Sequence, residues 1–145
     1  MLVEQLIRET LEMQGFRIKS VKKAGSELVI TLVPDLRYHP RCGVCNSPGD
    51  YRDTLSERRF RHVPLWAIPV TLVYAPCRVT CPECGSVHVE SMPWAAGKKR
   101  LTRAFAVALA SWAKSLPWLQ VARQFQCSWG TVAAAVAYVV AFGLS

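Results

Sequence analysis

The chain has 145 residues, 51% of them hydrophobic, which is enough for one ordinary domain or two small ones with a buried core. This composition excludes an intrinsically disordered chain, because such chains have too few apolar residues to form a core. The formal net charge of +8 and the pI near 9.5 fit a polyanionic partner such as nucleic acid, although charge alone fits a merely basic soluble protein equally well.

The positive charge is concentrated in the second part of the chain. Up to Glu90, twelve Lys and Arg stand against ten Asp and Glu, whereas residues 91–145 contain six basic residues and no acidic one. The second part is therefore the better candidate for contacts with phosphates.

The first residues predict a short amphipathic helix ending at Gly15, because one helical face carries Val3, Leu6, Ile7, Thr10 and Leu11. Residues 16–22 then alternate with period two, residues 24–26 have turn composition, and residues 28–33 are rich in β-branched side chains, so we expect a β-hairpin. The N-terminus lacks a basic start followed by an apolar run, so no secretory signal peptide is expected.

The six cysteines include two C-x-x-C pairs. Thiols stay reduced in a cytosolic chain, so paired cysteines indicate a metal site before a disulfide. Two such tight turns supply a tetrahedral set of thiolates, which suits Zn²⁺. The sequence therefore predicts one structural Zn²⁺ ion held by Cys42, Cys45, Cys81 and Cys84.

The alternatives are four unrelated reduced cysteines or a redox pair, and the presence of two pairs in one short chain argues against both. Four other side chains near the predicted site could replace one of these ligands: Cys77, His39, His62 and His88. The simpler expectation is that each of them packs in the core or faces solvent. Cys127 is expected to be a small core residue.

Between the cysteine pairs, residues 59–63 and 70–74 have strand composition and could form a hairpin in the gap. Residues 78–80 are expected to lead a strand into the second pair, and residues 87–90 to lead away from it. The stretch from residue 91 to 97, with Pro93 and Gly97, has the composition of a linker.

After this stretch the apolar period becomes helical, with one stripe formed by Leu101, Phe105, Ala108, Leu109 and Trp112. A second helix is expected to start near Pro117 and a third near Ser128. Residues 127–145 are uncharged, but they are mostly alanine with no basic flank beyond them, so we expect no membrane span.

Residues 121–132 have the pattern of a helix-turn-helix, with a generic pair of packed helices as the alternative. The residues expected to face inward are Val121, Ala122, Phe125, Val132 and Ala135. Cys127 would plug the turn and Ser128 would cap the following helix. Gln126 stands where many such turns have Gly, so it would have to adopt a less favourable backbone conformation.

Phosphate contacts are expected from Lys98, Lys99, Arg100 and Arg103, with help from Arg123. The start of the third helix offers Ser128, Trp129 and Thr131 as further DNA contacts. Its outer face is then mostly alanine, which cannot make bidentate bonds to a purine edge, so we expect modest specificity or, instead, packing of this face against another subunit. In the cysteine-rich finger, additional DNA contacts could come from Arg58, Arg59 and Arg61.

This order of parts resembles the N-terminal region of the ISL-three group of bacterial insertion-sequence transposases, over nearly the whole chain. The resemblance rests on the two cysteine pairs, the basic run Arg100-Leu101-Thr102-Arg103-Ala104-Phe105 and the helix-turn-helix pattern. It implies recognition of the terminal inverted repeats of an element by the finger and by residues 118–138. The catalytic RNase-H-like domain with its DDE triad would follow, so the chain would be an expressed fragment, a truncated element or a domesticated remnant.

The sequence thus predicts an α+β chain: an N-terminal helix and β-hairpin with a zinc ribbon in residues 1–92, a basic linker in 93–100, and a trihelical helix-turn-helix domain in 101–145. We expect it to bind double-stranded transposon-end DNA in the bacterial cytoplasm, associated with the nucleoid, and to have no catalytic activity alone. A homodimer is an open option for its assembly. The alternatives are a transposase-derived transcription regulator and a helical module for subunit assembly.

Overall fold

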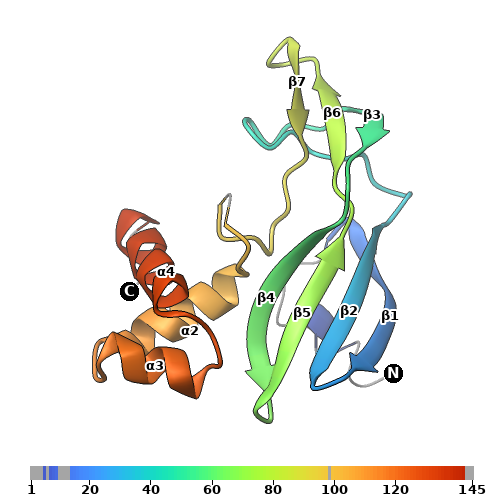
Figure 1. Ribbon diagram of the computed structural model, residues 1–145. Helices are drawn as coiled ribbons and strands as arrows, with labels where there is room; N and C mark the ends of the chain where they lie inside the picture. Colours follow the sequence, from blue (N-terminus) through green and yellow to red (C-terminus); the bar gives the residue numbers. More distant parts are fainter. Residues whose placement is uncertain (1–4, 6, 10–13, 98, 143–145) are drawn as a thin grey trace. The chain divides into compact units, whose positions relative to one another are not determined.

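The computed structural model describes residues 5, 7–9, 14–97 and 99–142 (Figure 1). Strands hold more of these residues than helices do. The strands are β1 Phe16–Ala24, β2 Glu27–Pro34, β3 Asp50–Thr54, β4 Arg58–Leu65, β5 Ile68–Tyr74, β6 Cys77–Cys81 and β7 Ser86–Val89; the helices are α2 Arg103–Ala113, α3 Trp118–Gln124 and α4 Trp129–Phe142.

The predicted fold class is wrong. The described chain is mostly β, in two sheets, and the helices α2, α3 and α4 all lie in the C-terminal region, so an α+β chain made of helix, hairpin, zinc ribbon and trihelical helix-turn-helix domain does not fit it. The amphipathic helix predicted around Val3–Leu11 lies largely outside the described residues; the described residues within it, 5 and 7–9, are helical.

The first sheet has four strands in the order β1-β2-β5-β4. The predicted N-terminal hairpin is formed by β1 and β2, and the strands expected to fill the gap between the cysteine pairs join it in one sheet. The reason lies in β5, whose residues Val70–Tyr74 are all buried. A strand buried along most of its length fits an interior place in a sheet, and β5 lies between β2 and β4.

The second sheet has three strands in the order β3-β6-β7, with antiparallel pairing throughout (Figure 1). Asp50 of β3 pairs with Thr80 of β6, and Cys81 pairs with Ser86 of β7. The strands predicted to lead into and away from the second cysteine pair are thus confirmed as β6 and β7. They position that pair in the turn between them.

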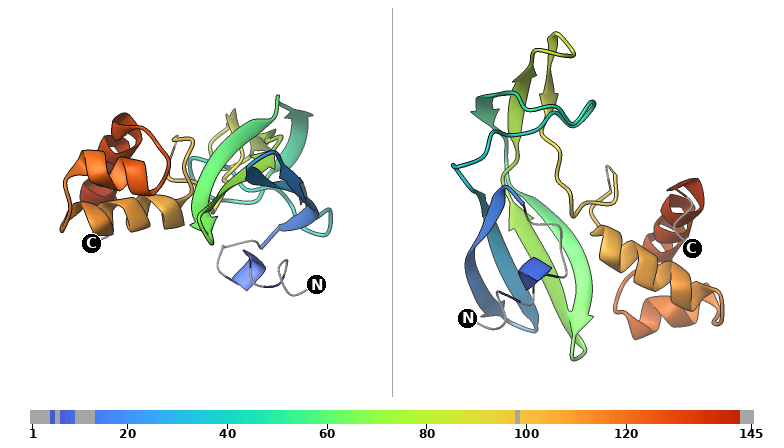
Figure 2. Two further views of the ribbon diagram at one scale, coloured as in Figure 1. Left: turned by 60° about the horizontal axis from the view of Figure 1, so that its bottom comes forward. Right: turned by 180° about the vertical axis from the view of Figure 1, so that it is seen from behind.

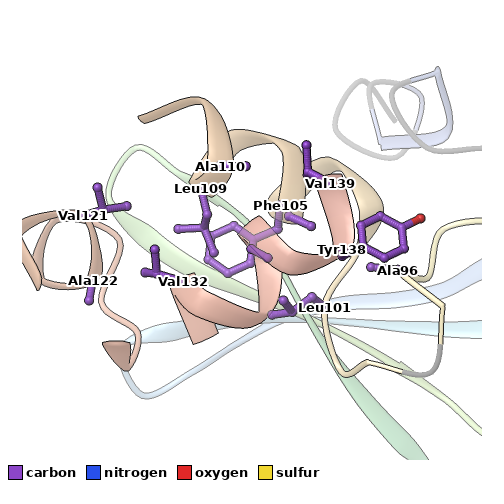
Figure 3. Packing of buried hydrophobic residues seen from close by; sticks show 12 residues of the cluster. Ala96, Leu101, Phe105, Leu109, Ala110, Val121, Ala122, Val132, Tyr138 and Val139 are labelled. Atoms are coloured by element: carbon purple, nitrogen blue, oxygen red, sulfur yellow. The ribbon is translucent and has the colours of Figure 1, made fainter. Parts of the chain in front are cut away.

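The three helices lie together in every view (Figure 2), with α2 and α3 both packed against α4. Figure 3 shows their side chains converging around Phe105 and Leu109 of α2. The inward-facing residues predicted as Val121, Ala122, Val132 and Ala135 are buried.

The stripe predicted on the first C-terminal helix is correct in part. Leu101, Phe105 and Leu109 are buried, but Trp112 is 53% exposed. Ala106 and Ala110 are buried in its place. Their small side chains fit a helix surface against which another helix packs closely.

The chain divides into two compact units, each built from three stretches. Unit 1 consists of Met1–Val21, Ile30–Arg59 and Val73–Pro93, and unit 2 of Lys22–Val29, Phe60–Leu72 and Trp94–Ser145. The domain boundaries expected from the sequence stay a prediction. Within the stretch expected to be a basic linker, Trp94, Ala95 and Ala96 are buried.

No single helix in the described part of the chain is long and apolar enough to cross a membrane. Taken together, α3 and α4 have the length and the apolar composition of a membrane span, but the pair is bent by 109° at the break between the two helices.

Candidate functional site

The four cysteines of the two C-x-x-C pairs meet in unit 1, as the sequence predicts. All four sulfur atoms lie within 4.8 Å of one another. The Sγ atoms of Cys42 and Cys84 are 3.9 Å apart, and those of Cys45 and Cys81 are 3.4 Å apart. Four thiols this close could bind a metal ion. Among the described residues no histidine or carboxylate joins the group, so the other ligands considered from the sequence are not part of it.

The two cysteine turns are built alike. The N–H of Asn46 donates to the carbonyl of Cys42, and the N–H of Gly85 donates to the carbonyl of Cys81, each at 2.9 Å. Asn46 and Gly85 occupy equivalent places after the second cysteine, and both have a left-handed backbone, with φ of 61° and 68°. Amide N–H groups also point at sulfur: Val44 N to Cys42 Sγ and Cys84 N to Cys81 Sγ, both 3.4 Å. Such bonds stabilise thiolates that bind a metal.

Backbone pairing brings the first turn to the end of β7. Cys42 forms a β-bridge with Glu90, and the Gly43 N–H donates to the Val89 carbonyl at 3.0 Å. A Cβ atom at Gly43 would overlap that same carbonyl oxygen. Glycine is therefore required at this position by close approach of the backbone.

The charge of the thiols is unevenly distributed. Hydrogen bonds from the side chain and backbone of Ser47 lower the pKa of Cys45 to about 6. Cys84, which faces the Cys45 thiolate, has its pKa raised to about 12 by that neighbour and by burial. Four thiolates in one place would repel one another, and a bound dication would remove that repulsion. A set of four sulfur ligands fits Zn²⁺ by its chemistry.

Sequence reasoning missed a buried carboxylate beside the cysteine site. Glu90 is 4% exposed and its Oε2 accepts from the Tyr74 hydroxyl and from the Cys77 N–H, both at 2.7 Å. Burial and the nearby Glu90 carboxylate raise the pKa of Tyr74, and burial raises that of Cys77 to about 12. The carboxylate therefore links the end of β7 to the ends of β5 and β6. In the sequence, Glu90 is a single acid that follows an apolar strand, and no pattern there indicates that it accepts these hydrogen bonds.

A groove of about 550 Å³ in unit 2 gathers several of the predicted DNA-binding residues. Its lining consists of Arg61, Lys99, Arg100, Leu101, Cys127, Ser128, Gly130, Thr131 and Ala134. At its helical wall, the Thr131 N–H donates to Ser128 Oγ at 3.1 Å, so Ser128 caps α4 as predicted. The groove thus sets three cationic side chains near the start of a helix, where the helix dipole is positive.

Arg61 is the most constrained of these cations. It lies in β4, half-buried, and donates from Nη1 to the Gln126 carbonyl at 2.9 Å and from Nη2 to the Phe125 carbonyl at 2.6 Å. Its guanidinium carbon is 5.2 Å from the centroid of the Phe105 ring. Arg61 therefore holds the end of α3, besides lining the groove. Gln126 has φ 57°, which confirms the strained turn predicted there.

The other predicted contacts are scattered. Arg58 and Arg59 lie in β4 rather than in the cysteine-bearing sheet. Arg103 and Arg123 are exposed on α2 and α3, and Trp129 packs on Trp118 with ring centroids 5.4 Å apart. Lys98 lies outside the described residues.

The excess positive charge of the chain belongs to one unit. Unit 1 contains nine Lys and Arg and nine Asp and Glu, whereas unit 2 contains nine Lys and Arg and one acid, Glu27. That acid accepts a hydrogen bond from Thr71 at 2.9 Å. The whole formal charge of +8 therefore comes from the unit that contains the groove.

The chain is similar to a transposase. It is 27% identical over 135 residues to the transposase for insertion sequence element IS1001 of Bordetella parapertussis. The alignment covers 91% of this chain but 33% of the other protein, so the chain spans about a third of the length of that relative. No family model matches the chain, and no solved structure matches it. The similarity supports a relationship to insertion-sequence transposases.

Proposed function

We propose that the chain is the DNA-binding region of an insertion-sequence transposase of the ISL-three type, and that it holds the terminal inverted repeats of the element. The similarity to a transposase over most of the chain supports this proposal. Strand cleavage is not part of the proposed role. A DDE triad needs acids converging on two metal ions, and here Asp35 and Asp53 each pair with an arginine, while Glu90 accepts internal hydrogen bonds.

The basic groove is the observation that carries the proposal. Duplex DNA presents a phosphate charge about every 1.7 Å along its axis, so its affinity depends on concentrated cations. Lys99 and Arg100 line the groove together with the first turn of α4, and no carboxylate is among the lining residues. Backbone N–H groups at a helix start favour phosphate in the same way that side-chain cations do.

The cysteine site has a structural role in this proposal. One Zn²⁺ ion would be held by Cys42, Cys45, Cys81 and Cys84 and would fix the β3-β6-β7 sheet. Such an ion supplies folding free energy to this small sheet of short strands.

The test measures binding of labelled duplex DNA by fluorescence anisotropy at several salt concentrations. Arg100→Gln should weaken binding to every sequence and should lower the slope of log affinity against log salt by about 1, because one phosphate contact is lost. Lys19→Gln is the matched control, since Lys19 is exposed on β1 in unit 1 and its loss removes the same charge. If the two substitutions changed DNA affinity and the salt slope equally, the groove would have no specific role, and the loss of affinity would reflect net charge alone.

A second role, assembly of subunits, is favoured by an apolar cavity of about 380 Å³ between the helices. Its lining residues are Ala110, Ala113, Lys114, Trp118, Val136, Val139 and Val140. Val140 is 76% exposed at this place, and a second copy of the chain would cover it. DNA binding and assembly use different faces of α4 and are compatible with each other.

A further inference from the structure

The two-residue turn between β4 and β5 presents a tryptophan to solvent. Trp66 is 85% exposed, and within the described part of the chain it has no ring partner. By contrast, the half-exposed Trp129 packs on Trp118. An indole offers some 150–250 Å² of surface for contact, and Trp66 leaves most of that surface open to solvent among the described residues.

The turn holds this side chain on a strained backbone. Trp66 and Ala67 both have left-handed conformations, with φ of 50° and 63°. Tight hairpins of this kind ordinarily use Asn and Gly at those positions, because other residues are strained there. A left-handed non-glycine residue costs on the order of 1–3 kcal/mol and persists where its surroundings fix it, often at functional sites.

The surroundings that fix the turn come from Gln126, in the turn between α3 and α4, and from Arg61 of β4. Gln126 Nε2 donates to the Ala67 carbonyl at 3.2 Å, and the Gln126 carbonyl accepts from Arg61 Nη1 at 2.9 Å. Gln126 is itself left-handed. Arg61 also lines the basic groove, so one hydrogen-bonded network connects the groove to the turn that carries Trp66. The backbone that carries the indole is therefore held in place before any partner binds.

The charge of the unit that carries Trp66 indicates the partner. Residues 58–74, which form the β4–β5 hairpin, contain three arginines and no acid, and unit 2 as a whole has one acid. A polyanion with flat aromatic faces fits both the charge and the exposed ring, and DNA has both properties. Trp66 follows Arg61 by five residues along β4, which is about 17 Å, or about five base-pair steps from the groove.

We propose that Trp66 stacks on a DNA base at an unstacked step of the duplex that the groove holds. The inference rests on the proposed DNA binding and adds a specific contact to it. Aromatic and apolar wedges on rigid elements unstack base steps in this way, and the cost is smallest where a base is already unpaired. The chain should therefore prefer a distorted duplex to an intact one.

The test compares an intact duplex with the same duplex containing one unpaired 2-aminopurine at its centre. The full chain should bind the bulged duplex more tightly and quench the 2-aminopurine fluorescence. Trp66→Asn is the decisive variant, because Asn tolerates a left-handed turn and so removes the ring without straining the fold. It should lose about tenfold in affinity for the bulged duplex and lose the quenching, while binding to the intact duplex stays unchanged.

Two controls accompany this variant. Trp66→Phe should keep most of the preference, and Trp112→Ala, which removes another exposed indole of unit 2, should change neither affinity. Equal binding of both duplexes by the wild type and by Trp66→Asn would overturn the inference and leave the proposed function intact. Failure of the wild type to bind either duplex would instead overturn the proposed function. Loss of self-association in Trp66→Asn, with DNA binding unchanged, would assign the ring to a protein contact and would also overturn the inference.

Discussion

A neutral histidine supports the first turn of α2. His62 Nδ1 lies 2.8 Å from the Thr102 hydroxyl oxygen, and that oxygen accepts from the Phe105 N–H at 3.1 Å. Burial lowers the pKa of His62 to about 4, so the ring is neutral near pH 7 and its Nδ1 can accept the Thr102 proton. Thr102 is fully buried, so this arrangement satisfies its hydroxyl group completely.

The low pKa of His62 makes stability depend on pH. The unfolded chain takes up the proton near pH 6.5 and the folded chain only near pH 4, so the contribution is complete above about 6.5 and is lost as the pH falls toward 4. Between neutral pH and about pH 5 the free energy of unfolding should fall by ~2 kcal/mol from this group alone. His62→Asn keeps an acceptor near Thr102 and has no titration, so urea unfolding should show a flatter pH profile. Superimposable profiles for the two proteins would contradict this account.

The cysteine turns show what a short element requires of its backbone. Each turn needs a left-handed residue after its second cysteine, and the first also needs the absence of a side chain at Gly43, because the Val89 carbonyl lies against it. The first requirement concerns the backbone conformation of Asn46 and Gly85, and the second concerns the space beside the Gly43 Cα atom.

Gly43→Ala should therefore damage the metal site. Its Cβ would push the end of β7 away from the first cysteine turn, and we expect at least a tenfold loss of Co²⁺ or Zn²⁺ affinity, followed through the thiolate-to-Co²⁺ absorption band. Gly25→Ala is the control: Gly25 has φ 64° with nothing near its Cβ position, so this change should cost ~1–2 kcal/mol of stability and leave the metal content unchanged. Normal metal affinity in Gly43→Ala would show that the turn can move aside.

Local patterns were predictable from the sequence, and long-range pairings were not. The C-x-x-C spacing identifies the cysteine cluster, and helical periodicity finds the burial of Val121 and Val132, because both depend on residues close together in the chain. The pairing of β2 with β5 joins residues some forty positions apart, and no short pattern encodes it. Arg61 looked like a free cation for the same reason, since its carbonyl partners lie about 65 residues away.

At the scale of the whole molecule, the net positive charge lies in unit 2, and within that unit the basic groove and the apolar cavity have different linings. The nine acids of unit 1 balance its nine basic residues, whereas unit 2 keeps nearly all of its positive charge. Within unit 2, Ala134 of α4 lines the basic groove and Val140 lines the apolar cavity. One helix thus carries the candidate surfaces for two partners.

Two glutamate substitutions on α4 separate these surfaces. Ala134→Glu places a negative charge beside Lys99 and Arg100, so it should weaken DNA binding at every protein concentration. Val140→Glu places a charge at an exposed position of the apolar cavity, so it should shift a dimer toward monomer in sedimentation experiments, with the fold preserved. Unchanged sedimentation of Val140→Glu, with the wild type shown to be a dimer, would exclude this cavity as the contact between copies.

The division into interleaved units has a consequence for the order in which the protein folds during synthesis. Unit 2 takes its stretches from residues 22–29, 60–72 and 94–145, so its first stretch leaves the ribosome long before its last. Arg61 and Trp66 are translated about sixty residues ahead of Phe125 and Gln126, whose carbonyl groups and side chain hold them. Until Phe125 and Gln126 have left the ribosome, the β4–β5 hairpin lacks the hydrogen bonds that hold Arg61 and Ala67 in place. The strained β4–β5 turn should therefore take its final form late, after the segment that holds it has been made.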